Sequence, residues 1–151
     1  MPRKPGEGRD SPLDQYLTWR LHRIAKLTDK HSSDAYAEEF GLPVGEARCL
    51  AAIGNFAPLS VNDLAAGANL NKGQASRAAQ ALVQRGLVSK EASVTDARGV
   101  VLTLTKAGNK LWNDVMATIA RRNEEIFGCL SVAEQRQLGT MLDRLIAHAA
   151  R

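Results

Sequence analysis

Two short helix-capping signals near the centre of the 151-residue chain constrain its fold more than any other feature. In the run Ser60-Val61-Asn62-Asp63 a hydroxyl precedes an acid by three residues, and Asn71 precedes Gln74 by the same interval. This spacing is typical of a helix start, because the two side chains can satisfy free N–H groups of the first turn. Small apolar residues then repeat on one helical face: Ala75, Ala78, Ala79, Leu82 and Val83. Two short helices joined at Asn69-Leu70-Asn71 and packed through small side chains predict a helix-turn-helix.

The segments that follow predict a β-hairpin and two long helices. Residues 87–90 and 100–104 are short β-rich runs, and the polar residues 91–99 between them favour a turn. Thr105 and Ser131 then begin two helices that carry long apolar stripes. A helix-turn-helix followed by a hairpin is a winged helix.

The N-terminal third of the chain also has helical periodicity. Apolar residues predict one helix over residues 13–30, and Ser33 or Asp34 is a candidate cap for a short second helix that ends at Gly41. A third helix is expected over residues 43–54, with proline in its first turn and glycine at its end.

We therefore expect a mainly α-helical fold with a small β-wing. The winged helix-turn-helix occupies residues 43–107, and dimerisation helices flank it at residues 13–42 and 108–151. Both flanks are apolar along one side, and a two-fold homodimer is the simplest way to bury a surface contributed by both ends of the chain. Residues 1–12 combine prolines, glycines and charges, which predicts a flexible arm.

Composition narrows the class of function. The formal net charge is +4, a weak indication of a polyanionic partner. No apolar run approaches the roughly 18 residues that a membrane helix needs, and no apolar segment of a secretory signal follows the basic N-terminus. Two cysteines cannot form a disulfide framework, so a reducing, cytoplasmic location is expected. Glycine-rich phosphate loops and nucleophile or zinc-protease motifs are absent, and the three histidines are scattered, so we expect no enzyme, no cofactor and no metal site.

A series of short motifs follows the predicted winged helix in order. They are Gly41-Leu42-Pro43, Cys49-Leu50, Leu64-Ala65, Ser76-Arg77, Leu82-Val83-Gln84-Arg85-Gly86-Leu87-Val88, Asp96-Ala97-Arg98-Gly99 and Leu104-Thr105-Lys106-Ala107-Gly108. In this order and spacing they resemble the MarR family of bacterial transcriptional regulators, over residues 13–149. The resemblance implies a triangular homodimer made by the terminal helices, with each subunit presenting its winged helix to a pseudo-palindromic operator in double-stranded DNA. Lys90 departs from the family pattern, because many relatives have arginine at the start of the wing.

The outer face of the second motif helix is the candidate for base recognition. Arginine can bind guanine O6 and N7, glutamine can bind adenine N6 and N7, and the first two turns usually reach the bases. We therefore expect Gln74 and Arg77 to contact bases. Lys72 and Ser76 are expected to contact phosphates. The whole predicted DNA interface comprises Ser60, Asn71, Lys72, Gly73, Gln74, Ser76, Arg77, Gln80, Asp96 and Arg98.

The wing supplies two of these residues, mainly on the strength of the resemblance. Arg98 stands beside Gly99 at the hairpin tip, where an arginine could enter a narrow minor groove. Asp96 cannot favour a phosphate and is expected to hold an arginine by a charge-assisted bond. Between residues 60 and 105 there are five Lys and Arg against three acids, an excess of +2, so affinity should fall moderately with salt.

An effector site is also implied, because many relatives release DNA when a small phenolic or aromatic acid binds between the dimer and DNA lobes. Such an acid needs an apolar slot and a cation. The candidates are Trp19, Arg20, Arg23, His31, Tyr36 and Arg48. The competing interpretation is that the aromatic residues belong to a core or interface and that the arginines are solvated.

The sequence thus predicts a dimeric, sequence-specific repressor that a small aromatic or phenolic acid releases from its operator. Two alternatives stay open. One is a winged-helix module that binds a protein. The other is an architectural DNA binder without ligand control.

Overall fold

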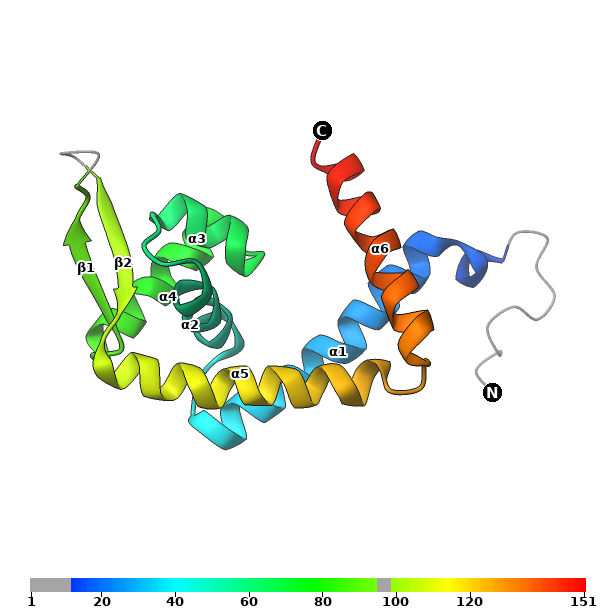
Figure 1. Ribbon diagram of the computed structural model, residues 1–151, viewed down its shortest axis with the longest axis horizontal. Helices are drawn as coiled ribbons and strands as arrows, with labels where there is room; N and C mark the ends of the chain where they lie inside the picture. Colours follow the sequence, from blue (N-terminus) through cyan, green and yellow to red (C-terminus); the bar gives the residue numbers. More distant parts are fainter. Residues whose placement is uncertain (1–11, 95–98) are drawn as a thin grey trace. The chain divides into compact units, whose positions relative to one another are not determined.

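The computed structural model describes residues 12–94 and 99–151, and it is mostly helical with a two-stranded antiparallel wing, as predicted (Figure 1). In chain order the elements are a 3-10 turn η1 (Leu13–Gln15), α1 (Leu17–Phe40), α2 (Val44–Phe56), α3 (Val61–Ala68), α4 (Lys72–Gln84), β1 (Val88–Ala92), β2 (Val100–Leu104), α5 (Lys106–Phe127) and α6 (Val132–Ala149). The chain forms two compact units, Met1–Val115 and Met116–Arg151. Most of the predicted arm, residues 1–11, lies outside the described residues.

The predicted interruption of the N-terminal helix is wrong. Residues 17–40 form one continuous helix, which passes through both candidate caps of a second helix, Ser33 and Asp34. Serine and histidine cost a helix only about 0.5 kcal/mol each relative to alanine, and no proline or glycine stands there to break it. Tyr36, one turn later, is buried, and its burial stabilises the continued helix. The helix ends at Gly41, whose positive φ of 63° suits glycine.

The end of α2 also differs from the prediction. The helix passes Gly54 and continues to Phe56. A Cβ atom at Gly54 would lie 2.2 Å from Cδ1 of Trp112, and the Trp112 indole donates a hydrogen bond of 3.1 Å to the carbonyl of Ala51. Gly54 is therefore a site of close packing against α5 and not a helix stop.

The helix-turn-helix forms as the capping signals predict. Ser60 Oγ accepts a 3.1 Å hydrogen bond from the backbone N–H of Asp63 at the start of α3. At the start of α4 the Asn71 and Gln74 side chains each accept from the other's backbone N–H, at 2.8 and 3.1 Å, which completes a capping box. Between the helices Asn69 takes the left-handed conformation, with φ 56°, and ends α3.

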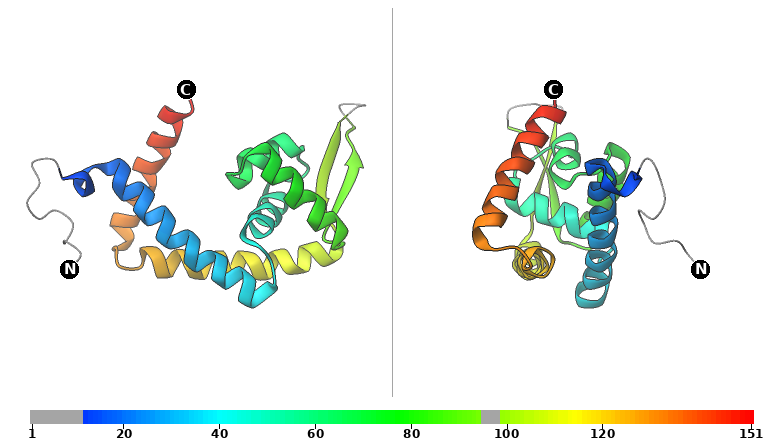
Figure 2. Two further views of the ribbon diagram at one scale, coloured as in Figure 1. Left: turned by 180° about the vertical axis from the view of Figure 1, so that it is seen from behind. Right: turned by 90° about the vertical axis from the view of Figure 1, so that its right-hand side faces the viewer.

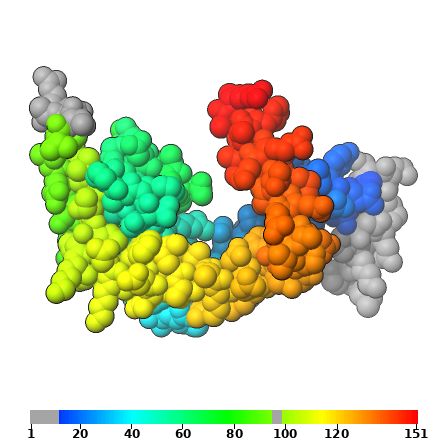
Figure 3. Space-filling model, in the orientation of Figure 1, coloured from blue at the N-terminus to red at the C-terminus, as the bar shows by residue number. Residues whose placement is uncertain are grey.

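The wing, β1 and β2, belongs to the same compact unit as the helix-turn-helix. In the ladder, Val88 pairs with Leu104 and Ala92 pairs with Val100. Leu59, just before α3, forms a further antiparallel bridge with Leu102 and joins the loop to the wing. The hairpin lies beside α4 and α3 (Figures 2 and 3). The core beneath them is made of fully buried aliphatic side chains: Leu42, Leu50, Ile53, Leu64, Leu82 and Leu102.

The second compact unit contains the end of α5 and α6. Ser131 and Glu134 form a second capping box at the start of α6, and hydrogen bonds from Ser131 lower the pKa of the Glu134 carboxyl. A shallow hollow of about 180 Å³ lies here, lined by Asn123, Phe127, Gln135, Leu138, Gly139 and Leu142.

Candidate nucleic-acid interface

The outer face of α4 is entirely polar and open to solvent. Its alanines and leucine point inward: Ala75, Ala78, Ala79 and Leu82 are all buried. The opposite face exposes the residues predicted to meet DNA, which are Asn71, Lys72, Gly73, Gln74, Ser76, Arg77 and Gln80. The helix therefore brings the predicted α4 contacts together on one surface. Ser60 is half-buried at the start of α3, where its oxygen is used as a helix cap.

Arg77 is one of the two cations of this face, with Lys72. Its side chain is exposed, and it makes no ion pair with any residue in the described part of the chain. Its guanidinium lies along the first turn of α4, because a Cβ atom at Gly73 would be 3.4 Å from Arg77 Nη1. Gly73 thus leaves room for the arginine side chain.

One contact on this face was not anticipated from the sequence. Lys90 Nζ, on β1, donates a 3.1 Å hydrogen bond to Gln80 Oε1 on α4. The contact joins α4 to β1, the first strand of the wing. Lysine in place of the family's usual arginine at position 90 was the one sign that this residue differs. Residue spacing alone does not reveal that Gln80 is the hydrogen-bond partner of Lys90.

Arg85 forms an ion pair within the fold and is not part of the polar outer face of α4. Its Nε atom lies 3.2 Å from Glu46 Oε1 on α2, a carboxylate whose side chain is only 13% exposed. One of the five cations counted toward a basic excess is therefore neutralised inside the unit. Asp96 and Arg98 lie outside the described residues, so their predicted roles at the wing tip stay predictions.

The predicted effector residues fall into separate places along the first two helices. Trp19 is half-buried, Arg20, Arg23 and His31 are exposed, and Tyr36 is buried. Because α1 is continuous and rises 1.5 Å per residue, Trp19 and Tyr36 lie roughly 25 Å apart along it. One small acid cannot touch both within a single chain.

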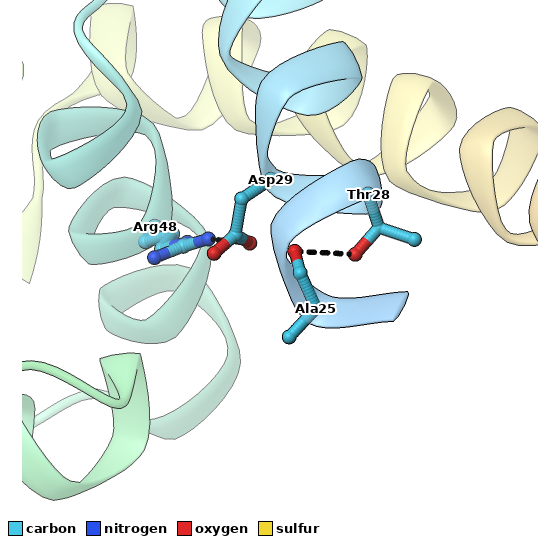
Figure 4. Close-up of polar contacts among 4 residues, drawn as sticks. All are labelled: Ala25, Thr28, Asp29 and Arg48. Carbon is cyan, nitrogen blue, oxygen red and sulfur yellow. Dashed lines mark hydrogen bonds and ion pairs between the residues drawn. The ribbon is translucent and has the colours of Figure 1, made fainter. Parts of the chain in front are cut away.

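Arg48 already has an acidic partner. Its Nη2 atom lies 2.6 Å from Asp29 Oδ1 on α1, so the pair links α1 to α2 (Figure 4). An acidic ligand at this position would have to compete with Asp29. A larger hollow of about 570 Å³ lies between the start of α3 and the wing, where Ser60, Asp63, Glu91 and Thr103 are among its lining residues. Neither this hollow nor that of the second unit is lined by a predicted effector residue.

Comparison with known proteins agrees with this architecture. The family model described as MarR family matches residues 40–99, which run from the last residue of α1 to the residue before β2. Over these 60 of its 151 residues the chain resembles the MarR family. It is similar to the transcriptional regulator BilQ of Clostridium symbiosum, with 28% identity over 70% of this chain and 73% of that protein. It is 26% identical to the transcriptional repressor Rv2887 of Mycobacterium tuberculosis, over 93% of this chain and 97% of that one.

Solved structures show the same fold. A MarR family regulator from Silicibacter pomeroyi superposes with a TM-score of 0.83 and 24% identity, and the match covers 98% of each chain. The complex of Rv2887 with salicylic acid superposes with a TM-score of 0.70 and 26% identity, over 88% of this chain and 98% of that one. Proteins of the MarR family are DNA-binding transcriptional regulators and not enzymes, and both relatives named above are transcriptional regulators. Within the described ranges, no helix is long and apolar enough to cross a lipid bilayer.

The two cysteines of this protein differ sharply in environment. Cys49 is buried in α2, and burial together with the nearby Glu46 carboxylate raises its pKa from 9.0 to about 11. Cys129 is exposed after α5. Thiolate is the reactive form, so at pH 8 we expect iodoacetamide to modify Cys129 alone in the folded protein and both thiols after denaturation. Mass spectrometry of peptides checks this, and labelling of native Cys49 would contradict it.

The raised pKa of Cys49 also predicts a pH effect. The unfolded thiol ionises near 9.0 and the native thiol near 11. Between these values the native state holds more protons than the unfolded state, so the stability contributed by the neutral thiol is complete below pH 9 and is lost as pH rises toward 11. Urea unfolding of Cys49→Ala should show a shallower loss of stability over that range than the unsubstituted protein.

Proposed function

We propose that this protein is a homodimeric repressor that acts in the cytoplasm and is released from a pseudo-palindromic operator by a small aromatic or phenolic acid. The observation that supports DNA binding is the arrangement of α4. The outer face of this helix is polar and exposed, and its inner face consists of buried alanine and leucine. The proposed division of labour assigns residues 43–107 to DNA binding and residues 13–42 and 108–151 to dimerisation.

Apolar side chains left in solvent support the dimer. Near the N-terminus, Leu13, Tyr16, Leu17, Leu21, Ile24 and Leu27 are all at least 42% exposed. On α6 the same is true of Val132, Met141, Leu145 and Ile146. A row of large apolar side chains in water is costly for a single chain, and a two-fold partner would bury both sets.

Selection of the purified protein on a random duplex library, at one stated salt concentration, tests the proposal. A dimer should enrich an inverted repeat whose half-site centres lie about 10 bp apart, which is one helical turn. Weak, salt-sensitive binding without an enriched sequence would favour the architectural alternative. Absence of binding by ligand-free protein would favour the protein-binding module.

The effector part is supported by the complex of the relative Rv2887 with salicylic acid. Salicylate should raise the melting temperature of this protein by mass action and weaken its hold on the selected operator, whereas cyclohexanecarboxylate should do neither. Because the candidates lie in two places, one near the start of α1 and one where Arg48 of α2 pairs with Asp29 of α1, Arg20→Ala and Arg48→Ala distinguish them. Loss of the salicylate effect in one variant and its retention in the other would locate the site.

A further inference from the structure

The amide side chains on the outer face of α4 are not free to use both of their functional groups. Gln80 Oε1 accepts a 3.1 Å hydrogen bond from Lys90 Nζ, and Gln74 Oε1 accepts a 3.1 Å hydrogen bond from the backbone N–H of Asn71. An ammonium and a backbone N–H can only donate, so the atom that faces each of them must be the amide oxygen. In both glutamines the Nε2 group makes no hydrogen bond within residues 12–94 and 99–151, so it is the group available to a further acceptor.

This arrangement matters because glutamine reads adenine with both of its groups. The amide oxygen accepts from adenine N6 while the amide nitrogen donates to N7. With its oxygen turned toward a donor of the protein, the side chain can offer its nitrogen to an acceptor, but it must break that bond or share its second lone pair to accept from adenine N6. The two cations of this surface, Lys72 and Arg77, can only donate.

We propose that α4 presents a donor surface that reads acceptor edges in the major groove, guanine O6 and N7 above all, and that Lys90 withholds the Gln80 oxygen from adenine. Lys90 is thus a positioning residue that sets base choice from the wing without touching the base. The inference rests on the proposed function, since it requires α4 to lie in the major groove. It also replaces the general expectation that glutamines on this helix select adenine.

The geometry permits a sharp comparison of variants. Lys90 is exposed on β1 and shares a face of the hairpin with its ladder partner Leu102, so a substitution there should keep an unbranched aliphatic stem. Lys90→Met keeps the aliphatic stem and removes the donor, and Lys90→Arg keeps a donor. Lys110→Met, at an exposed lysine on α5, removes the same charge elsewhere and serves as the control.

The experiment is selection of all four proteins on one random duplex library at one salt concentration. A fifth protein, Gln80→Ala, identifies the base pair that Gln80 reads as the position at which preference is lost. At that position we expect guanine with the unsubstituted protein, with Lys90→Arg and with Lys110→Met. With Lys90→Met the freed oxygen should shift preference toward adenine by about fivefold or more.

Several results would overturn the inference. Adenine at the Gln80 position in the unsubstituted protein would show that the oxygen is available, and an unchanged profile for Gln80→Ala would show that this residue reads no base. If Lys90→Met weakens binding uniformly and lowers the salt slope by about one, with base choice unchanged, then Lys90 binds a phosphate instead. Failure of the proposed function itself has a different signature, because no sequence would then be enriched by any of the five proteins.

Discussion

Replacing Gly108 with alanine should destabilise the protein by about 3 kcal/mol or more, near the upper end for an overpacked site. A Cβ atom on Gly108 would lie 1.9 Å from the carbonyl oxygen of Leu87 and 3.4 Å from Cβ of Leu104. The Leu87 carbonyl is part of the backbone and accepts a hydrogen bond from Thr105 N–H at 3.1 Å, so it cannot move aside without loss. The sign is notable, because glycine to alanine in a helix ordinarily stabilises.

Gly45→Ala provides the matched control. Gly45 also lies in a helix of the same compact unit, yet nothing lies within 4 Å of the Cβ position. Alanine there should raise the free energy of unfolding by about 0.5 kcal/mol. Urea unfolding of both variants at one protein concentration measures the difference. An unchanged midpoint for Gly108→Ala would mean that the start of α5 does not pack on Leu87 as closely as described.

Local signals explain why the helix-turn-helix was predictable. A cap and its third residue interact within one turn, so Ser60 with Asp63, and Asn71 with Gln74, carry their structure in adjacent residues. The inward face of α4 followed from helical period in the same way. Ser131 with Glu134 repeats the pattern at α6.

The features that escaped prediction depend on residues far apart in the chain. Gly54 resembled a helix stop because its neighbour Trp112 lies 58 positions later, and only the fold brings them together. Ser33 and Asp34 resembled caps because the sequence does not show that Tyr36 is buried by residues outside its own helix. Of the candidate site, the α4 face was predictable. The sequence could not predict that the Gln74 and Gln80 oxygens already accept hydrogen bonds within the protein. It also could not predict that the effector candidates Trp19 and Tyr36 lie far apart along one helix.

Arg77→Ala should weaken operator binding by about 1–3 kcal/mol, which corresponds to roughly 5- to 150-fold, and relax base choice at one position. Arg77 is exposed on the second turn of α4, has no acidic partner within residues 12–94 and 99–151, and offers a fork that matches guanine O6 and N7. Fluorescence anisotropy with the selected operator, and with each single-base variant of it, gives both quantities.

Arg85→Ala separates this role from charge alone. It removes the same charge from the end of the same helix, but Arg85 is paired with Glu46, so its loss should lower stability and leave base preference intact. Arg77→Lys completes the comparison, because it keeps the charge and loses the bidentate fork. Base choice should stay relaxed in Arg77→Lys while the salt dependence returns to that of the unsubstituted protein. Equal losses in Arg77→Ala and Arg85→Ala, with base choice retained in both, would remove Arg77 from the base-reading surface and leave it a counter-charge to phosphate.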